Sequence, residues 1–201
     1  SSNVGFINSY CNDDDCSIIK NLQGDWIMKQ KTKFCDRFFN LSPKICIYDL
    51  DGTIIDSSHR IRLRENGSLD LEHWKENSTK EMIFQDDLLP MYWQLVADYK
   101  EGNIIVICTA REFGKYDWEY LHSMGIYYDY VISRPSGIDT VDHILKKTQL
   151  RKFWNLRQFK NLFKSFYDDN LNNLKSVREL GQCHTVDAGK WNNRFSGKKS
   201  Q

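Results

Sequence analysis

Two carboxylates at the end of an apolar run are the first residues of this chain that could do chemistry. Residues 45–48 are apolar or aromatic, Asp49 and Asp51 follow them, and Gly52 then allows a sharp turn. Two acids this close at the mouth of a buried strand either repel each other, which raises a pKa, or share a cation that neutralises both. We interpret the pair as part of a site for a divalent cation.

Three further apolar runs also end on polar or charged side chains. These side chains are Thr109 and Arg111 after residues 104–108, Arg134 after residues 130–132, and Asp168 and Asp169 after residues 162–167. In an open parallel sheet, ligands bind outside the carboxyl ends of the strands. The sequence therefore predicts that these side chains meet Asp49 and Asp51 at one edge, where the acids hold a divalent metal beside an anion such as phosphate.

Short apolar runs alternate with amphipathic stretches along the chain, and these elements must position the site. The predicted strands are residues 45–48, 104–108, 130–132, 162–167 and 184–187, and the predicted helices are residues 86–101, 116–124, 140–153 and 170–180. This alternation is typical of an α/β fold in which helices cover both faces of an open parallel, Rossmann-like sheet.

The chain divides into a core domain and flanking segments. Residues 44–191 form the core, and the polar residues 57–85 within it are an insertion that could cap the end of the first strand. Residues 1–43 are interpreted as an N-terminal extension packed on the core. Residues 192–201 are polar and are predicted to be a frayed tail.

Composition narrows the partners that the chain can have. Of its 201 residues, 40% are hydrophobic, which suits one well-buried domain. It carries 28 Lys and Arg against 27 Asp and Glu, so no global field attracts it to nucleic acid or membrane, and any affinity for phosphate must be local. The sequence contains no bilayer-spanning apolar stretch and no pattern of a signal peptide. We expect no membrane partner, reduced cysteines and a cytoplasmic location, in the host cytoplasm if the chain is viral.

Four motifs, in order along the chain, resemble those of the haloacid dehalogenase superfamily of phosphohydrolases. They are Asp49-Leu-Asp-Gly-Thr53, Thr109 after an apolar run, Lys146 on a later helix, and Asp168-Asp169. Within that superfamily the chain is similar to the phosphatase domain of bacteriophage polynucleotide kinase and to phage-type deoxynucleoside monophosphatases. The residues that carry this second similarity are 109–112 (Thr-Ala-Arg-Glu), 133–135 (Ser-Arg-Pro) and Asp142. The phosphate-binding loop of the kinase half has no counterpart here.

The resemblance implies a phosphate transfer in two steps. Asp49 would attack phosphorus to form an aspartyl-phosphate, and Asp51 would give a proton to the leaving oxygen and then take one from the attacking water. A Mg²⁺ ion would be held by Asp49, the backbone carbonyl of Asp51, and Asp168 or Asp169.

The resemblance also implies which residues bind the phosphate. Thr109 and Lys146 would contact the transferring oxygens, and Arg111 and Arg134 would be additional clamps suited to bidentate contact. Lys147 and Lys152 compete with Lys146 for this role, and the preference for Lys146 depends on the helical spacing of the family pattern.

These residues favour a magnesium-dependent phosphomonoesterase that acts on a small-molecule nucleotide, first of all a deoxynucleoside 5′-monophosphate. A phosphatase acting on the 3′ end of a nucleic acid is the alternative, because a short cap leaves an open site. A non-catalytic protein that binds phosphate or nucleotide is a third reading, although such a protein has no need of the second carboxylate, Asp51.

Overall fold

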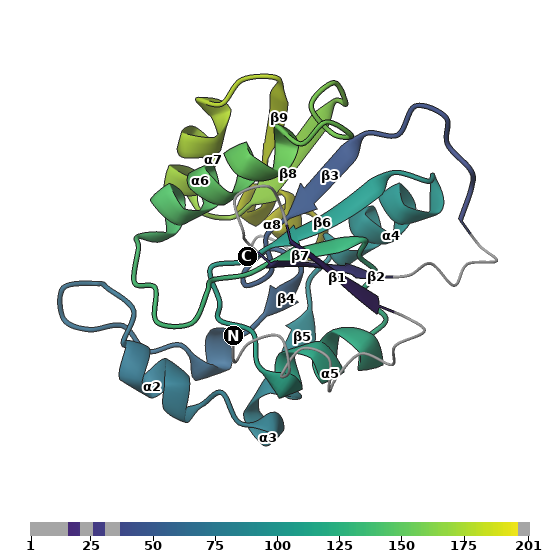
Figure 1. Ribbon diagram of the computed structural model, residues 1–201. Helices are drawn as coiled ribbons and strands as arrows, with labels where there is room; N and C mark the ends of the chain where they lie inside the picture. The colour runs from purple at the N-terminus through teal and green to yellow at the C-terminus, as the bar shows by residue number, and fades with distance from the viewer. Residues whose placement is uncertain (1–15, 21–25, 31–36, 197–201) are drawn as a thin grey trace.

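A seven-stranded sheet lies at the centre of the computed structural model, which describes residues 16–20, 26–30 and 37–196 (Figure 1). Five neighbouring strands are parallel, in the order β7-β6-β3-β8-β9. They are β3 (Ile45–Tyr48), β6 (Ile104–Cys108), β7 (Tyr130–Ile132), β8 (Lys164–Asp168) and β9 (Cys183–Asp187). The chain proceeds to one side of β3 and then returns to its other side, so the order reverses between β3 and β8. The predicted α/β class and parallel sheet are confirmed.

Helices cover both faces of the sheet. One face carries α4 (Tyr92–Lys100), α5 (Lys115–Ser123) and α8 (Ala188–Phe195), and the other carries α6 (Asp142–Trp154) and α7 (Leu171–Arg178). A hydrophobic core lies on each face of the sheet. Along β3, Cys46 and Tyr48 belong to the core beneath α4 and α5, whereas Ile45 and Ile47 belong to the core beneath α6 and α7. A strand buried on both faces needs apolar residues at every position, which is why β3 is a continuous apolar run.

An antiparallel hairpin extends the sheet beyond β7. Strand β1 (Cys16–Lys20) pairs with β2 (Trp26–Gln30), and β2 pairs with β7. Both strands lie in the segment 1–43, for which the sequence predicts no strand; residues 1–15, 21–25 and 31–36 lie outside the described residues. Arg37 contacts the core directly, because its Nη1 donates to Asp129 Oδ1 at 2.7 Å and its guanidinium lies over the Tyr99 ring.

The polar insertion folds into a small unit between two short antiparallel strands, β4 (Ile55–Asp56) and β5 (Asp87–Leu88). It contains η1 (Ser58–Arg60), α2 (Leu71–Glu76) and α3 (Lys80–Ile83), and it lies on the side of the sheet toward which β3 points (Figure 1). Asp70 starts α2 by accepting a hydrogen bond from His73 N at 3.1 Å. The insertion therefore stands over the end of β3.

Two predicted boundaries differ from the structure. The helix expected from residue 86 begins at Tyr92, because Asp87 pairs with Asp56 in the ladder between β4 and β5. The tail expected from residue 192 is wrong at its start, because α8 continues to Phe195 and Asn192 is buried. The remaining predicted strands and helices lie within one or two residues of the observed ones. Within the described residues, no helix has the length and apolar character required to cross a membrane.

Candidate active site

The turn after β3 presents both acids of the first motif. Asp49 continues the pairing of β3 with β8 through its N–H, which donates to Tyr167 O at 2.9 Å. Gly52 then adopts a φ of +79°, and a Cβ at this position would lie 2.3 Å from Asp169 Oδ2. Glycine is therefore required here for two reasons, the left-handed backbone and the closeness of a carboxylate.

A buried lysine joins the acid after β3 to the acid after β8. Lys146 on α6 places its Nζ 2.6 Å from Asp49 Oδ1 and 2.8 Å from Asp168 Oδ2. Thr53 Oγ1 donates to the other oxygen of Asp49 at 3.0 Å, and Asn173 Nδ2 donates to Asp168 Oδ2 at 3.1 Å. Burial lowers the pKa of Lys146, but the charges of Asp168 and Asp49 outweigh burial and raise it well above its ordinary value. The ammonium group is therefore charged.

Three carboxylates form a group of the kind that binds a hard cation. Oxygens of Asp49, Asp168 and Asp169 lie within 4.8 Å of one another. Burial and the charge of Asp168 raise the pKa of Asp49 against the opposing charge of Lys146, and desolvation and Asp168 also raise the pKa of Asp169, whose side chain reaches the surface. One ammonium against three carboxylates leaves negative charge uncompensated. The donor set therefore fits a divalent cation with oxygen ligands, such as Mg²⁺. The Asp51 carboxylate lies outside this group.

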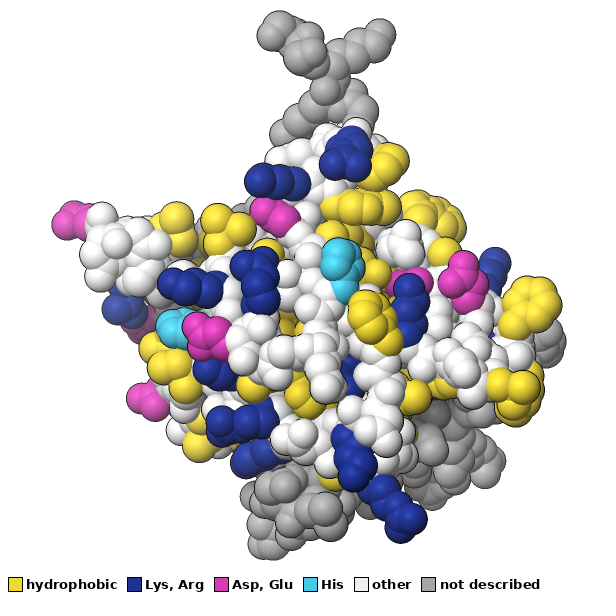
Figure 2. Space-filling view, turned by 90° about the horizontal axis from the view of Figure 1, so that it is seen from above, with side chains coloured by type: hydrophobic (Ala, Val, Ile, Leu, Met, Phe, Trp, Pro, Cys, Tyr) yellow, Lys and Arg dark blue, Asp and Glu magenta, His cyan; other side chains and the backbone are white. Residues whose placement is uncertain are grey.

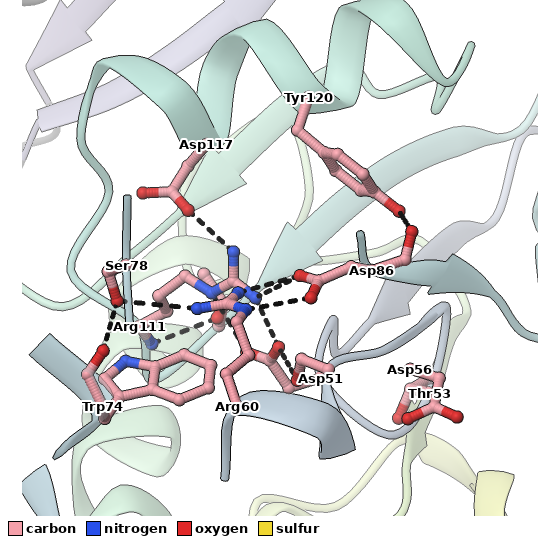
Figure 3. Close-up of polar contacts among 12 residues, drawn as sticks. Asp51, Thr53, Asp56, Arg60, Trp74, Ser78, Asp86, Arg111, Asp117 and Tyr120 are labelled. Atoms are coloured by element: carbon pink, nitrogen blue, oxygen red, sulfur yellow. Dashed lines mark hydrogen bonds and ion pairs between the residues drawn. The ribbon is translucent and has the colours of Figure 1, made fainter. Parts of the chain in front are cut away.

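Asp51 points instead toward an arginine of the second motif (Figure 3). Arg111 binds both of its oxygens, with Nε 3.1 Å from Oδ2 and Nη2 on Oδ1, and Ser57 Oγ donates to Oδ1 at 2.7 Å. Burial opposes ionisation of Asp51, but Arg111 and Ser57 outweigh it and lower the pKa of this carboxyl. Arg111 Nη1 also binds Asp117 Oδ1 at 2.7 Å. The expected phosphate clamp Arg111 is thus bound to two carboxylates and holds Asp51 in place.

Thr109 lies buried beside the end of β6. Its N–H donates to Ile132 O at 2.9 Å, and its Oγ1 accepts a hydrogen bond from Arg111 N at 3.1 Å. The parallel register pairs Tyr48 with Ile107, so Thr109 follows β6 at the same edge at which Asp49 follows β3. The sheet therefore places Thr109 at the same edge as Asp49, and its role in binding phosphate stays a prediction.

Arg134 lies in the loop after β7. Its side chain binds that loop and the neighbouring turn after β6. Its Nε donates to Ala110 O at 2.8 Å, its Nη1 donates to Thr140 O at 2.7 Å, and its Nη2 pairs with Asp142 at 2.8 Å. These contacts fasten the turn that carries Thr109 to the start of α6. Its role as a phosphate clamp stays a prediction.

Sequence reasoning missed the charged residues that surround Arg111 (Figure 3). Arg60 is buried in the insertion and binds Asp86 twice, at 2.9 Å through Nε and 2.8 Å through Nη2, and Trp74 stacks 4.2 Å from its guanidinium. Asp86 also lies 3.8 Å from Arg111. Three arginines in the insertion look alike in sequence, and only the fold shows that one is buried. Asp117 carried a weak signal as an acid in the first turn of α5.

The parallel sheet, the insertion after its first strand and the acids at the strand ends give this chain a haloacid dehalogenase-like fold. Solved structures agree in fold: a chain of the Pnkp1/Rnl/Hen1 complex has a TM-score of 0.54 at 21% identity over 78% of this chain and 50% of that chain. A haloacid dehalogenase-like hydrolase from Streptococcus pneumoniae has a TM-score of 0.51 at 14% identity, over 69% of this chain and 81% of the other.

The chain belongs to the bacteriophage T5 5′-deoxynucleotidase family, whose model matches residues 28–196. The 5′-deoxynucleotidase of Escherichia phage T5 is 38% identical to it over 100 residues. That alignment spans 48% of this chain and 41% of the phage T5 protein. The expected likeness to phage nucleotidases is confirmed, and the fold agrees with the expected resemblance to the haloacid dehalogenase superfamily.

Proposed function

We propose that this chain is a magnesium-dependent phosphomonoesterase that hydrolyses deoxynucleoside 5′-monophosphates through an aspartyl-phosphate on Asp49. The observation that carries the proposal is the position of Asp49, which is bonded to a charged Lys146 beside two further carboxylates. Asp51, two residues along, is held apart from them by Arg111. The name of the phage T5 relative supports the substrate class.

The chain's own residues can perform both halves of the reaction. Lys146 and Thr53 bind one oxygen each of Asp49, which orients the carboxylate for attack on phosphorus. The bond to the nucleoside oxygen breaks as Asp51 gives that oxygen a proton. Asp51 then takes a proton from the water that attacks the aspartyl-phosphate, which restores Asp49 and releases phosphate. A dianionic phosphate beside Asp51 favours its protonated form, which offsets the lowering by Arg111.

Negative charge is the obstacle to this attack, because the nucleophile and the phosphate repel each other. A divalent cation held by Asp49, Asp168 and Asp169 would offset that repulsion. Lys146 supplies a positive charge at the same place, and Thr109 offers a buried hydroxyl at the neighbouring strand end. These residues would contact the transferring oxygens.

Phosphate release from the four deoxynucleoside 5′-monophosphates, from ribonucleotides and from 3′-phosphorylated oligonucleotides would test the proposal. We expect the deoxynucleoside monophosphates to be preferred, activity to require Mg²⁺, and Asp49→Asn to abolish turnover. A preference for 3′-phosphorylated ends would replace the proposed substrate by nucleic-acid ends. Absence of turnover on every substrate would favour a binding protein.

The covalent step needs a separate measurement. Acid quenching during turnover of a radiolabelled substrate should leave label on the wild-type chain and none on Asp49→Asn. Asp51→Asn should retain some label, because a neutral amide can neither protonate the leaving group well nor activate water for the second step. Full activity of Asp49→Asn would exclude the covalent mechanism.

A further inference from the structure

Positive charge is concentrated in one stretch of this nearly neutral chain. Residues 143–167 contain seven of the 28 Lys and Arg and no Asp or Glu. The rest of the chain therefore holds 21 basic residues against all 27 acidic ones. The net charge of +1 conceals a basic region inside an otherwise acidic protein.

The fold exposes most of these cations on one side of the sheet. We call this region the α6 surface, and its members are Lys147, Arg151, Lys152, Arg157 and Lys160 from α6 and the loop after it, with Lys175 and Arg178 from α7. Lys146 and Lys164 are buried and do not belong to it. Figure 2 shows many Lys and Arg side chains on the face seen from above, among hydrophobic and acidic ones.

The two helices contribute to one continuous field. Glu179, an acid at the end of α7, is bound by Lys147 at 2.7 Å. The hydrogen bond and charge of Lys147 lower the pKa of this exposed carboxyl, and the charges of Lys175 and His143 add to that lowering. Lys147 from α6 and Lys175 from α7 thus both act on Glu179. They lie close enough to it that salt leaves this interaction largely unscreened.

An exposed aromatic ring lies at the far end of this surface. Phe163 is 58% exposed, and it lines a shallow hollow of about 390 Å³ together with Asn161, Leu162 and Gln182. Its carbonyl accepts a hydrogen bond from Ile45 N at 2.8 Å, which fixes the backbone that carries the ring. Phe163 precedes β8, whereas Asp168 ends it, so the hollow lies about 16 Å from the catalytic edge.

We propose that the α6 surface is a docking site for single-stranded nucleic acid, separate from the active site. Cations that follow a phosphate backbone, combined with an aromatic ring on which a base can stack, are the two components of binding to single strands. Arg151, Arg157 and Lys160 would contact phosphates, and Phe163 would stack on a base. A paired duplex hides the faces of its bases, so the ring favours a single strand. A membrane surface would instead need a broad apolar face beside the cations.

Fluorescence anisotropy with a labelled oligothymidylate, titrated with the full chain at several salt concentrations, tests the proposal. Affinity should fall steeply between about 50 and 200 mM salt, because bound cations displace counterions from the strand. The triple variant Arg151→Gln, Arg157→Gln, Lys160→Gln should bind about tenfold or more weakly, with the log–log salt slope reduced by about 2. Phe163→Ala should weaken binding roughly fivefold or more with little change in slope.

The matched control is a variant with the same loss of charge elsewhere, Arg64→Gln, Lys75→Gln, Lys100→Gln, at three exposed positions outside the α6 surface. It should bind like the wild type, and hydrolysis of mononucleotides should be unchanged in both triple variants because none of these residues belongs to the active site. Equal weakening by both variants, tighter binding to anionic vesicles than to the oligonucleotide, or no binding at about 50 mM salt would each overturn the proposal.

Discussion

Lys146 lies between two buried carboxylates that would otherwise repel each other. It is 1% exposed, and its ammonium contacts Asp49 at 2.6 Å and Asp168 at 2.8 Å. Asp51 has a different partner, Arg111, which keeps its carboxylate away from this group. The two acids of the first motif thus differ in chemistry because each faces a different cation. The proposed mechanism assigns attack to one and proton transfer to the other, and it relies on this difference in environment rather than on residue type.

Replacing Lys146 by Met should abolish phosphate release and destabilise the chain by about 3–5 kcal/mol in the absence of divalent ions, because two carboxylates then lie buried without a counter-charge. The neighbouring Lys147→Met is the matched control. Lys147 is half-exposed and pairs with Glu179 on the surface, so its loss should cost less than about 1 kcal/mol and leave turnover intact. Urea unfolding and a phosphate assay check both. Comparable effects of the two substitutions would contradict the assignment of the active-site lysine.

Among the elements, the turn after β3 is one that a single methyl group would disrupt. Gly52 and Gly67 have nearly the same φ, +79° and +81°, but only Gly52 faces Asp169, since a Cβ at Gly67 meets nothing within 4 Å. Both Gly→Ala substitutions should therefore cost about 1 kcal/mol of backbone strain. Only Gly52→Ala should also displace Asp169 and lower Mg²⁺-dependent activity. Activity titrated with Mg²⁺ separates the two effects, and equal activity of both variants would count against Asp169 as a metal ligand.

Helix α8 supports the same turn from the other end of the chain. Asn192 donates through Nδ2 to Thr53 O at 3.0 Å and accepts a hydrogen bond from Met91 N at 2.8 Å. Asn192→Ala would leave two buried backbone groups without partners and should cost about 2–4 kcal/mol. Asn193→Ala, on the exposed side of the same helix, should change stability by less than about 0.5 kcal/mol. Thermal unfolding of both variants tests this, and a stable Asn192→Ala would place α8 among the dispensable elements.

How well each element could be predicted depends on whether its residues are buried on both faces. Strands β6 and β7 match residues 104–108 and 130–132 because full burial requires a continuous apolar run. The start of α4 could not be predicted, because the acids at 86 and 87 resemble the first turn of a helix. Only the pairing of Asp87 with β4 shows that this segment is a strand. Helix α8 has a mainly polar sequence, and the few residues that it buries do not distinguish it from a tail.

At the scale of the whole molecule, residues 143–167 are basic, whereas the rest of the chain carries more acids than bases. The sheet order brings the acids after β3 and β8 together at one edge, because these two strands are neighbours. That meeting could be predicted, since carboxyl ends of parallel strands share an edge. The buried contact between Arg60 and Asp86 could not, because it joins the two ends of an insertion that has no apolar periodicity. The net charge of +1 likewise gives no sign of the α6 surface, because a sum over the chain removes the asymmetry.

The cluster of three acids, Asp49, Asp168 and Asp169, also couples the stability of the whole chain to pH and to metal binding. Burial and neighbouring charge raise the pKa values of Asp49 and Asp169 above the ordinary value of 3.8. The folded chain therefore holds protons that the unfolded chain releases, so without divalent ions this cluster makes stability fall as pH rises above 3.8. Asp51, whose pKa is lowered, acts in the opposite sense and only below that pH.

Mg²⁺ should reverse this loss, because it binds the ionised carboxylates in competition with protons. At about a hundred times its dissociation constant it should add about 2.7 kcal/mol at neutral pH and much less near pH 4, where the cluster holds protons. Thermal unfolding with Mg²⁺ or with a chelator, across this pH range, measures the difference. Asp168→Asn is the control and should lose most of the Mg²⁺ effect. Stabilisation that is independent of pH, or equal in the Asp168→Asn chain, would show that Mg²⁺ acts elsewhere on the molecule.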